Sequence, residues 1–503
     1  MQATLTKKVV LKTGLYGSTS AGYTSPYVAA THQPESPPIN VGAGLDIPVG
    51  YFLTGAKGET IICGGASKLV GITGAPNQFK STLQDYMAWS VLNVLRTSVP
   101  YAILTCYDNE QSKTMSRQQH LSKRFPYIPE DIVLSTENKD GCFVLNTKAD
   151  MDGVDWLKSV SKSITDRCSS KIRIKYTAFK DSTGKVLELP IPEVATLDSL
   201  SELSSSKLEK DLLENIGTSG SNMTYAQGGL FKSHIVSQIP GLASKGNTIF
   251  FMTAHKGKVS ITQQQGPINI PERQIANLKV GDKIKKIPEN FLFLSNVLYE
   301  VKSSLLTNKT TMLPEYPTSY GSMHAKDLYA MTVSVIRAKG GMSAPAHTIV
   351  VSQTDGVLPA LTEFHYIKEN DRYGLIGNSP TSVHYALAIY PDVTLSRTTV
   401  RDKLDEDPLL CRAVNIVSEW LQIKHHHPNM YRKYKDWIDS PTTVYEKIKE
   451  LGYDWAALLD TRGYWIPDQY NEEIQPFLSS IDILRTCAGE YIPYFLSTKK
   501  KDK

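Results

Sequence analysis

LVGITGAPNQFKSTL, residues 69–83, joins an apolar run to a glycine-led polar loop and to the first turn of a helical pattern. The loop GAPNQFKST (74–82) nearly matches the phosphate-binding pattern G-x-x-x-x-G-K-[ST], but Phe79 stands where the second glycine belongs. A glycine there normally lets the backbone wrap closely around a phosphate. The loop therefore leaves two interpretations open, a nucleotide site with an unusual loop or a plain strand-turn-helix.

The segments around this loop indicate the fold class. From about residue 58 onward, apolar runs of strand length alternate with longer amphipathic segments. This alternation is typical of an α/β protein with a mostly parallel central sheet flanked by helices. Helices are predicted over residues 79–98 and 231–245. Strands are predicted over 68–74, 101–110, 191–198 and 247–257, and over 294–304, 329–341 and 346–356, whose closer spacing indicates an antiparallel extension of the sheet.

Composition excludes several classes of protein. The chain has 503 residues, 41% hydrophobic and 21% charged, as is usual for a globular protein of several domains. A net charge of +5 permits nucleic-acid binding without arguing for it. The six cysteines form no CxxC pair, which fits free thiols in a reducing compartment better than disulfides or a zinc site. Neither a long apolar run nor a signal-peptide pattern occurs, so we expect a cytoplasmic location (the host cytoplasm if the protein is viral) and no membrane partner.

Three regions can be separated by composition. Residues 1–55 are rich in Gly, Ser, Thr and Pro and are predicted to form an N-terminal arm rather than a core. Residues 56–377 carry the predicted sheet and form the candidate catalytic core. Residues 378–503 are dominated by helical patterns and are predicted to form a mostly helical C-terminal region.

Residues at the carboxyl end of the first strand have the chemistry of an anion site. In an open parallel sheet, ligands bind beyond the carboxyl ends of the strands. Backbone N–H groups and the following helix N-terminus can surround a phosphate, Lys80 adds a positive charge, and the Ser81 hydroxyl can ligate Mg²⁺. The candidate nucleotide-binding residues are Gly74, Ala75, Pro76, Asn77, Gln78, Phe79, Lys80, Ser81 and Thr82.

Three further strands end in polar residues that should meet at the same edge. Glu110 follows the second strand and could orient the water that attacks a γ-phosphate, with a surface acid as the alternative. Asp198 ends the third strand. An apolar run followed by an aspartate is the pattern of a carboxylate that holds the magnesium shell of a bound nucleotide. His255 ends the fourth, where a structural histidine is the common alternative. The combination of one loop and three polar strand ends favours a nucleotide site.

In their order these motifs resemble the RecA-type ATPase core, and most closely the phage UvsX branch of homologous recombinases. That branch tolerates an aromatic residue before the loop lysine, as in GAPNQFKS. YDNE is similar to the family's strand end with the catalytic carboxylate, which implies that role for Glu110. TLDSLSEL resembles its Walker B segment and implies a magnesium role for Asp198, while FFMTAH implies that His255 senses the nucleotide. The resemblance covers roughly residues 55–377.

The same resemblance implies contacts between protomers. VSVIRAKGG looks like the strand whose basic residues reach the ATP of the neighbouring protomer, which makes Arg337 and Lys339 candidate trans-acting cations. Solvated strand-end cations are the alternative. Seven positions after the catalytic carboxylate, where the family often has an aromatic residue that stacks on adenine, this chain has Arg117, whose guanidinium can also stack on a base. The N-terminal arm would be a strap between subunits.

DNA binding would fall to two polar stretches, residues 204–229 and 256–286. The helix SNMTYAQGGLFKSHI resembles the one that follows the family's first DNA-binding loop. The second stretch is dense in basic residues, so binding should weaken steeply with salt, and a solvated lysine-rich loop is the alternative. The candidate DNA-binding residues are Lys256, Lys258, Arg273, Lys279, Lys283, Lys285 and Lys286.

The resemblance implies a DNA-dependent ATPase that acts as a recombinase, with ATP and Mg²⁺ as cofactors. Protomers would polymerise into a helical filament on single-stranded DNA and pair that strand with homologous duplex DNA in recombination and repair. Single-strand-binding and mediator proteins are further expected partners. Two alternatives stay open: a hexameric ring helicase of the same superfamily, and a nucleotide-binding assembly protein with weak turnover.

Overall fold

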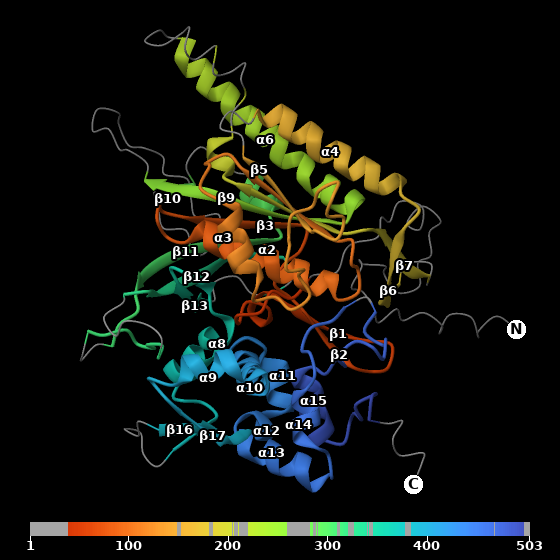
Figure 1. Ribbon diagram of the computed structural model, residues 1–503, viewed down its shortest axis with the longest axis vertical. Coiled ribbons are helices and arrows are strands. Elements are labelled where there is room, and N and C mark those ends of the chain that lie inside the picture. The colour runs from red at the N-terminus through yellow and green to blue at the C-terminus, as the bar shows by residue number, and fades with distance from the viewer. Residues whose placement is uncertain are drawn as a thin grey trace, which may run out of the picture.

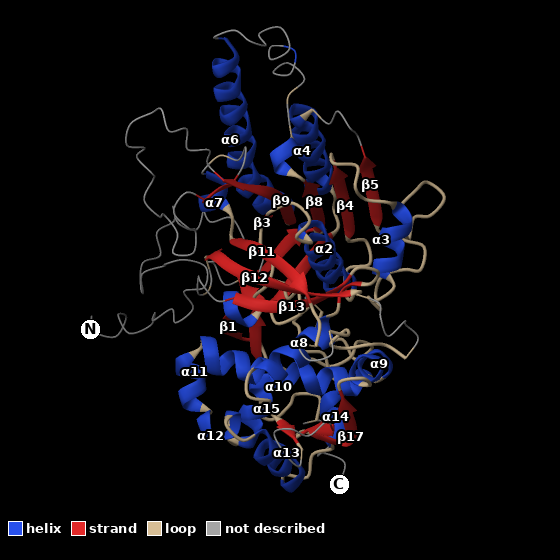
Figure 2. Cartoon of the chain, turned by 90° about the vertical axis from the view of Figure 1, so that its left-hand side faces the viewer, coloured by secondary structure: helices blue, strands red, loops and turns tan. Residues whose placement is uncertain are grey.

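A computed structural model gives the architecture of the chain (Figure 1). It describes residues 39–147, 152–180, 185–203, 220–258, 282–284, 290–308, 312–319, 326–339, 346–377, 384–466 and 468–496, with residues 205, 210, 288 and 341. A large sheet flanked by helices forms one part, and a group of mostly short helices forms the other (Figures 1 and 2). The predicted α/β class with a mostly parallel sheet is confirmed.

Ten strands form the central sheet. Its parallel part runs in the order β11 (Val297–Leu305), β3 (Leu69–Gly74), β9 (Thr248–Lys258), β8 (Glu193–Asp198), β4 (Ile103–Asp108) and β5 (Phe143–Thr147). The antiparallel part continues from β11 through β12 (Leu328–Ala338), β13 (Ala346–Ser352) and β14 (Gly356–Val357), as predicted, and the short strand β10 (Asp282–Ile284) pairs with β9. The strand that leads into the loop, β3, therefore lies in the interior of the sheet.

Helices cover both faces of the sheet because its central strands are apolar on both. All six residues of β3 are buried; Val70 and Ile72 belong to the core under helix α2 (Lys80–Arg96), whereas Leu69 belongs to the core on the opposite face. The opposite face is covered by α4 (Gly153–Ser169) and α6 (Gly220–Gly246), which lie together in Figure 1. This three-layer arrangement leaves the carboxyl edge of the parallel strands for the loops.

Two elements of the sheet layer differ from the sequence prediction. The segment near 136–190, where the sequence analysis predicts no element, contributes the edge strand β5 and helix α4, and then the separate hairpin β6 (Arg173–Lys180) and β7 (Val186–Pro190). Helix α6 begins at Gly220, as the resemblance of SNMTYAQGGLFKSHI implied, and not near 231, as the helical spacing alone predicted; the adjacent Gly228 and Gly229 do not interrupt it. Sequence patterns treat such a glycine pair as a helix breaker.

The C-terminal part has its own apolar core around Trp420. It begins with a small sheet of β15 (Leu375–Ile376), β16 (His384–Leu387) and β17 (Tyr390–Ser396), where the sequence had indicated helices from about residue 380 onward. Its helices are α9 (Val400–Glu406), α10 (Pro408–His426), α11 (Pro428–Lys433), α12 (Lys435–Ile438), α13 (Pro441–Glu450), α14 (Trp455–Leu459) and α15 (Ser480–Cys487). Helix α8 (Pro359–Glu369) packs against both β13 and α10 and so joins the two parts (Figure 2).

The N-terminal segment that the structure describes is part of the core. Residues 39–49 bury every second side chain from Ile39 to Val49, and they precede the hairpin β1 (Tyr51–Thr54) and β2 (Thr60–Cys63). The carbonyl of Val41 accepts hydrogen bonds from the hydroxyls of Tyr86 and Ser90 on α2. Residues 1–38 of the predicted arm lie outside the described residues. Among the residues described, no helix has the length and apolar character needed to span a membrane.

Ionisation of a buried glutamate should make stability depend on pH. Glu363 of α8 is fully buried, accepts a hydrogen bond from Asn415, and has its pKa raised to about 8, chiefly by burial. Because the unfolded chain releases this proton near pH 4.3, the free energy of unfolding should fall as the pH rises from about 4 to about 8. Glu363→Gln should remove roughly 2–4 kcal/mol of that fall. Urea unfolding at pH 5 and at pH 8 measures this difference in the free energy of unfolding. If the variant loses as much stability between the two pH values as the wild type does, the prediction is wrong.

Candidate active site

Four of the sequence-predicted residues meet at one edge of the sheet. The parallel register pairs Gly74 at the end of β3 with His255 in β9, and Asp108 at the end of β4 with Asp198 at the end of β8. Glu110 follows two residues after the end of β4. The loop, the acids and the histidine therefore share the carboxyl edge, where open α/β sheets bind ligands.

The loop between β3 and α2 holds two residues in left-handed backbone conformations. These are Asn77, with φ 57°, and Phe79, with φ 59° and ψ 26°. Phe79 thus adopts the conformation that a glycine adopts without strain. Its partly buried ring packs against that of Tyr329, with 5.0 Å between centroids. The ring contact offsets the backbone strain at the position where the motif's glycine is missing.

Replacing Phe79 tests this balance. Phe79→Gly removes both the strain and the ring contact, so we expect nearly unchanged ATP binding, measured by titration with a fluorescent ATP analogue. Phe79→Ala is the matched control because it loses the ring but keeps the left-handed backbone. The alanine variant should be less stable than the glycine variant by about 1–2 kcal/mol in urea unfolding. Equal stability of the two variants would show that the backbone at this position is not strained.

The loop is braced against the neighbouring strand β11. A side chain at Gly74 would place its Cβ only 2.8 Å from the carbonyl oxygen of Val301, so only glycine fits there. The Gln78 Oε1 atom accepts a 2.5 Å hydrogen bond from the backbone N–H of Ser303. These contacts on both sides of the turn fix the loop relative to the sheet.

Lys80, the first residue of α2, is buried with its ammonium turned back into the loop. Its Nζ donates a 2.8 Å hydrogen bond to the carbonyl oxygen of Ala75. Burial lowers the pKa of Lys80, while the charges of Asp198 and Glu110 act in the opposite direction. These influences show that both acids lie within electrostatic reach of the lysine. The arrangement places a cation against the loop at the beginning of a helix, where a phosphate is favoured.

Glu110 and His255 contact each other directly. Glu110 Oε1 lies 2.9 Å from His255 Nε2, and the two side chains are 27% and 21% exposed. The backbone N–H groups of Asn109 and Glu110 both donate to the carbonyl oxygen of Asp198, and the N–H of His255 donates to the Ser201 hydroxyl. The ends of β4 and β8 are thus linked to β9 at His255, which does not end its strand as predicted, since β9 continues to Lys258; Glu110 is held at the surface of the site.

One oxygen of the Asp198 carboxylate accepts a hydrogen bond, and the other lies 3.8 Å from the buried ammonium of Lys113. Oδ1 accepts a 2.5 Å hydrogen bond from the Thr253 hydroxyl. Oδ2 is buried and has no hydrogen-bond partner among the residues described. A carboxylate oxygen and a hydroxyl, as Asp198 and Ser81 supply, are of the ligand types that suit Mg²⁺, which protein sites bind through one or two carboxylates plus substrate phosphates. Within the described ranges, no cluster of three or more His, Cys, Asp or Glu side chains is placed to hold a metal ion.

Arg117 lies at the rim, on helix α3 (Met115–Ser122). Its guanidinium donates hydrogen bonds to the backbone carbonyls of Gln353 and Thr354, in the turn between β13 and β14. Next to that turn, Thr82 and Leu121 line a cavity of about 330 Å³. To stack on a base, as predicted, Arg117 would have to release these carbonyls.

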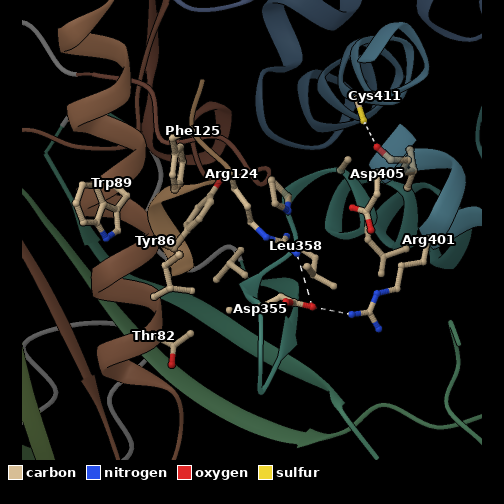
Figure 3. Close-up of a pocket in the computed structure, with 17 residues that line it drawn as sticks. Thr82, Tyr86, Trp89, Arg124, Phe125, Asp355, Leu358, Arg401, Asp405 and Cys411 are labelled. Atoms are coloured by element: carbon tan, nitrogen blue, oxygen red, sulfur yellow. Dashed lines mark hydrogen bonds and ion pairs between the residues drawn. The ribbon is translucent and has the colours of Figure 1, made fainter. Parts of the chain in front are cut away.

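The cavity lies between α2 and the C-terminal part (Figure 3). Aromatic side chains of α2 and of the segment after α3 form one wall, and the remaining lining comes mainly from the turn before β14, from β14 itself and from α8, α9 and α10. Charged groups cross it: Asp355 forms ion pairs with Arg401 at 3.1 Å and with Arg124 at 3.7 Å. The labelled lining residues in Figure 3 are Thr82, Tyr86, Trp89, Arg124, Phe125, Asp355, Leu358, Arg401, Asp405 and Cys411.

The structure separates two predicted residues from this edge. Arg337 is the second-last residue of β12 and Lys339 follows the strand directly; this end of β12 pairs with the beginning of β11 and so lies at the opposite edge of the sheet from the loop. Arg337 lies over the ring of Phe293, and Lys339 Nζ donates to the carbonyl oxygen of Leu294, the last residue of α7 (Asn290–Leu294). Neither cation can contact the nucleotide loop of its own protomer.

The predicted DNA-binding residues fall mostly outside the described part. Arg273, Lys279, Lys285 and Lys286 lie there entirely. For Lys258 in β9 and Lys283 in β10 only the backbone is described, and the two strands pair antiparallel. The ammonium of Lys256 forms an ion pair with Glu300 of β11, so its charge is compensated within the protomer.

One residue of the site was not singled out by the sequence analysis. Lys113, three residues after Glu110, has a side chain only 3% exposed and an ammonium 3.8 Å from Asp198 Oδ2. A lysine in a polar segment such as NEQSKTMS normally predicts a solvated side chain. No sequence pattern distinguishes this lysine, since its partners lie on other elements.

Comparisons with known proteins add no assignment. No protein-family model matches the chain. No curated protein matches it either.

Proposed function

We propose that the chain is an ATP-dependent homologous recombinase with a RecA-like ATPase core. The observation that carries the proposal is the meeting of Lys80, Asp198, Glu110 and His255 at the carboxyl edge of a parallel sheet, around a loop of the phosphate-binding type. The strand arrangement, with the loop strand inside the sheet and an antiparallel extension beyond it, is compatible with such a core. The order of these motifs along the chain supports the same assignment.

Each residue has a defined task in ATP hydrolysis. Lys80 would neutralise phosphate charge, and the loop N–H groups would hold the phosphate oxygens. Ser81 and Asp198 would hold Mg²⁺, which supplies charge neutralisation when it is bound. Glu110 would orient the attacking water and accept its proton. Since Glu110 lies against His255 at 2.9 Å, it must exchange that contact for the water, and His255 would thereby couple the site to the strand that leads into residues 256–286.

The positions of Arg337 and Lys339 are consistent with assembly. They lie at the edge opposite the loop, where a second protomer could meet them but their own nucleotide could not. In the proposed filament these cations would stabilise transition-state charge at the neighbour's site. A protomer in isolation would then turn over ATP slowly.

The proposal predicts nucleotide-dependent filaments. Purified protein should form helical filaments on single-stranded DNA with a non-hydrolysable ATP analogue and should yield joint molecules with homologous duplex when ATP is present. Negative-stain images and a joint-molecule assay measure both, with reactions lacking nucleotide as the control. Closed rings with fork unwinding would instead support the helicase, and nucleotide binding without turnover or DNA binding would support the assembly protein.

A further inference from the structure

Lys113 lies at the centre of a buried polar cluster behind the proposed magnesium carboxylate. Its ammonium donates hydrogen bonds to Asp85 Oδ1 at 2.5 Å and to Gln84 Oε1 at 2.8 Å, both on α2, and lies 3.8 Å from Asp198 Oδ2. The side chains of Lys113 and Asp85 are 3% and 10% exposed. One ammonium therefore serves two buried carboxylates on different elements.

The partners of Lys113 are themselves fixed. The other Asp85 oxygen accepts from Gln118 of α3, whose own oxygen accepts from the Trp89 indole. The Gln84 amide donates to the carbonyl oxygens of Leu197 and Phe251, in strands β8 and β9. The ammonium itself contacts α2 and the end of β8, and its partners Asp85 and Gln84 carry the connection on to α3 and to the two central strands.

The segment that carries Glu110 is anchored through the same residue. The backbone N–H of Lys113 donates a 2.7 Å hydrogen bond to Asp108 Oδ2, so residues 108–113 are closed into a short loop. At the other end of that loop, the N–H of Glu110 donates to the Asp198 carbonyl oxygen at 3.3 Å. The side chain of Lys113 then attaches the loop to α2.

The charge of Lys113 is maintained by its surroundings. Burial alone would lower the pKa of the ammonium, but the nearby carboxylates, Asp85 foremost and Asp198 with it, outweigh burial and raise the pKa above its usual range. A neutral side chain at this position would leave two buried carboxylates facing each other. The same electrostatics make a single substitution of Lys113 costly to folding.

We infer that Lys113 is a positioning residue of the nucleotide site. It holds the Asp198 carboxylate and the Glu110 loop in register with α2, the helix that presents Lys80 and Ser81. The inference rests on the proposed function and names a residue that the motifs do not include. Outer residues that orient a metal-binding carboxylate typically change metal affinity 10- to 100-fold when they are replaced.

The test separates positioning from folding by removing both members of the buried pair. Lys113→Met with Asp85→Asn removes one positive and one negative charge, so the net charge beside Asp198 is unchanged, and only the ammonium that faces Asp198 is lost; folded proteins often tolerate such a replacement of a buried ion pair. We expect this double variant to fold, as checked by circular dichroism. Its half-saturating Mg²⁺ concentration for binding of a fluorescent ATP analogue should rise 10- to 100-fold, and its turnover should fall at saturating Mg²⁺.

A second variant keeps the inference testable if the double variant does not fold. Asp85→Asn alone leaves the ammonium with Asp198 as its main charged partner, so Lys113 should compete with Mg²⁺ and raise the half-saturating concentration. Lys158→Met is the control, because Lys158 is 72% exposed on α4 and should change nothing. If a folded variant of either kind keeps the wild-type Mg²⁺ dependence, Lys113 is structural only and the inference fails. If the wild type binds no Mg²⁺–nucleotide, the proposed function fails, and the inference fails with it.

Discussion

Lys80→Ala is expected to abolish ATP binding while leaving the fold intact. The Lys80 ammonium is the cation nearest the loop backbone, with Nζ 2.8 Å from the Ala75 carbonyl oxygen, and it would transfer to phosphate oxygens when ATP enters. A hydrogen bond to a charged group contributes about 1.5–3 kcal/mol, and an ammonium donates up to three. The dissociation constant should therefore rise by roughly a hundredfold or more.

The stability of this variant distinguishes loss of binding from loss of structure. Burial lowers the pKa of Lys80, so the empty protein gains little from keeping this charge. Lys80→Ala should unfold in urea near the wild-type midpoint, and titration with a fluorescent ATP analogue should show no saturation. Lys158→Ala, on the exposed face of α4, serves as the matched control and should bind normally. Tight ATP binding by a folded Lys80→Ala protein would rule out the loop as the phosphate site.

Glu110→Gln is expected to abolish ATP turnover and to preserve ATP binding. Glutamine has nearly the same shape and can keep the 2.9 Å contact with His255, so the geometry of the strand ends should survive. It cannot accept a proton from water, and removal of a general base typically lowers the rate by about 10²–10⁴-fold. Phosphate release measures the loss of ATP hydrolysis. Titrations with a fluorescent ATP analogue and with single-stranded DNA measure whether binding is kept.

The outcome of Glu110→Gln also discriminates between functions. A recombinase should lose turnover and keep nucleotide-dependent filaments on single-stranded DNA, because binding does not require the base. An assembly protein with a degenerate site should show no turnover to lose. Wild-type rates in Glu110→Gln would place the catalytic carboxylate elsewhere. Asp155→Asn, at a 76% exposed position on α4, is the control for removing one negative charge.

The sequence was sufficient to predict the local elements of the site. The strands predicted over 68–74, 101–110 and 191–198 correspond to β3, β4 and β8, because apolar runs of this length are typical of buried parallel strands. Polar residues directly after such runs must lie at the carboxyl edge, whichever strands are neighbours. The positions of Glu110 and His255 could therefore be predicted without knowing the strand order.

The tertiary structure decided which elements are neighbours. Strand β5 joins the sheet from a segment for which no strand was predicted, and β16 and β17 form where helices were expected, since strand formation depends on packing and pairing as well as on local sequence. The conformation of Phe79 depends in the same way on the ring of Tyr329, 250 residues further along the chain.

The loop, the strand ends and their chemical types were thus determined by the sequence alone, because hydrophobic periodicity and turn residues act within a few positions along the chain. The burial of Lys113 against Asp85 and beside Asp198 was decided only by the tertiary structure. Its partners are 28 and 85 positions away (113 minus 85, and 198 minus 113). A lysine is buried only where folding brings carboxylates to it, and that depends on the packing of α2 against β8 rather than on any local pattern.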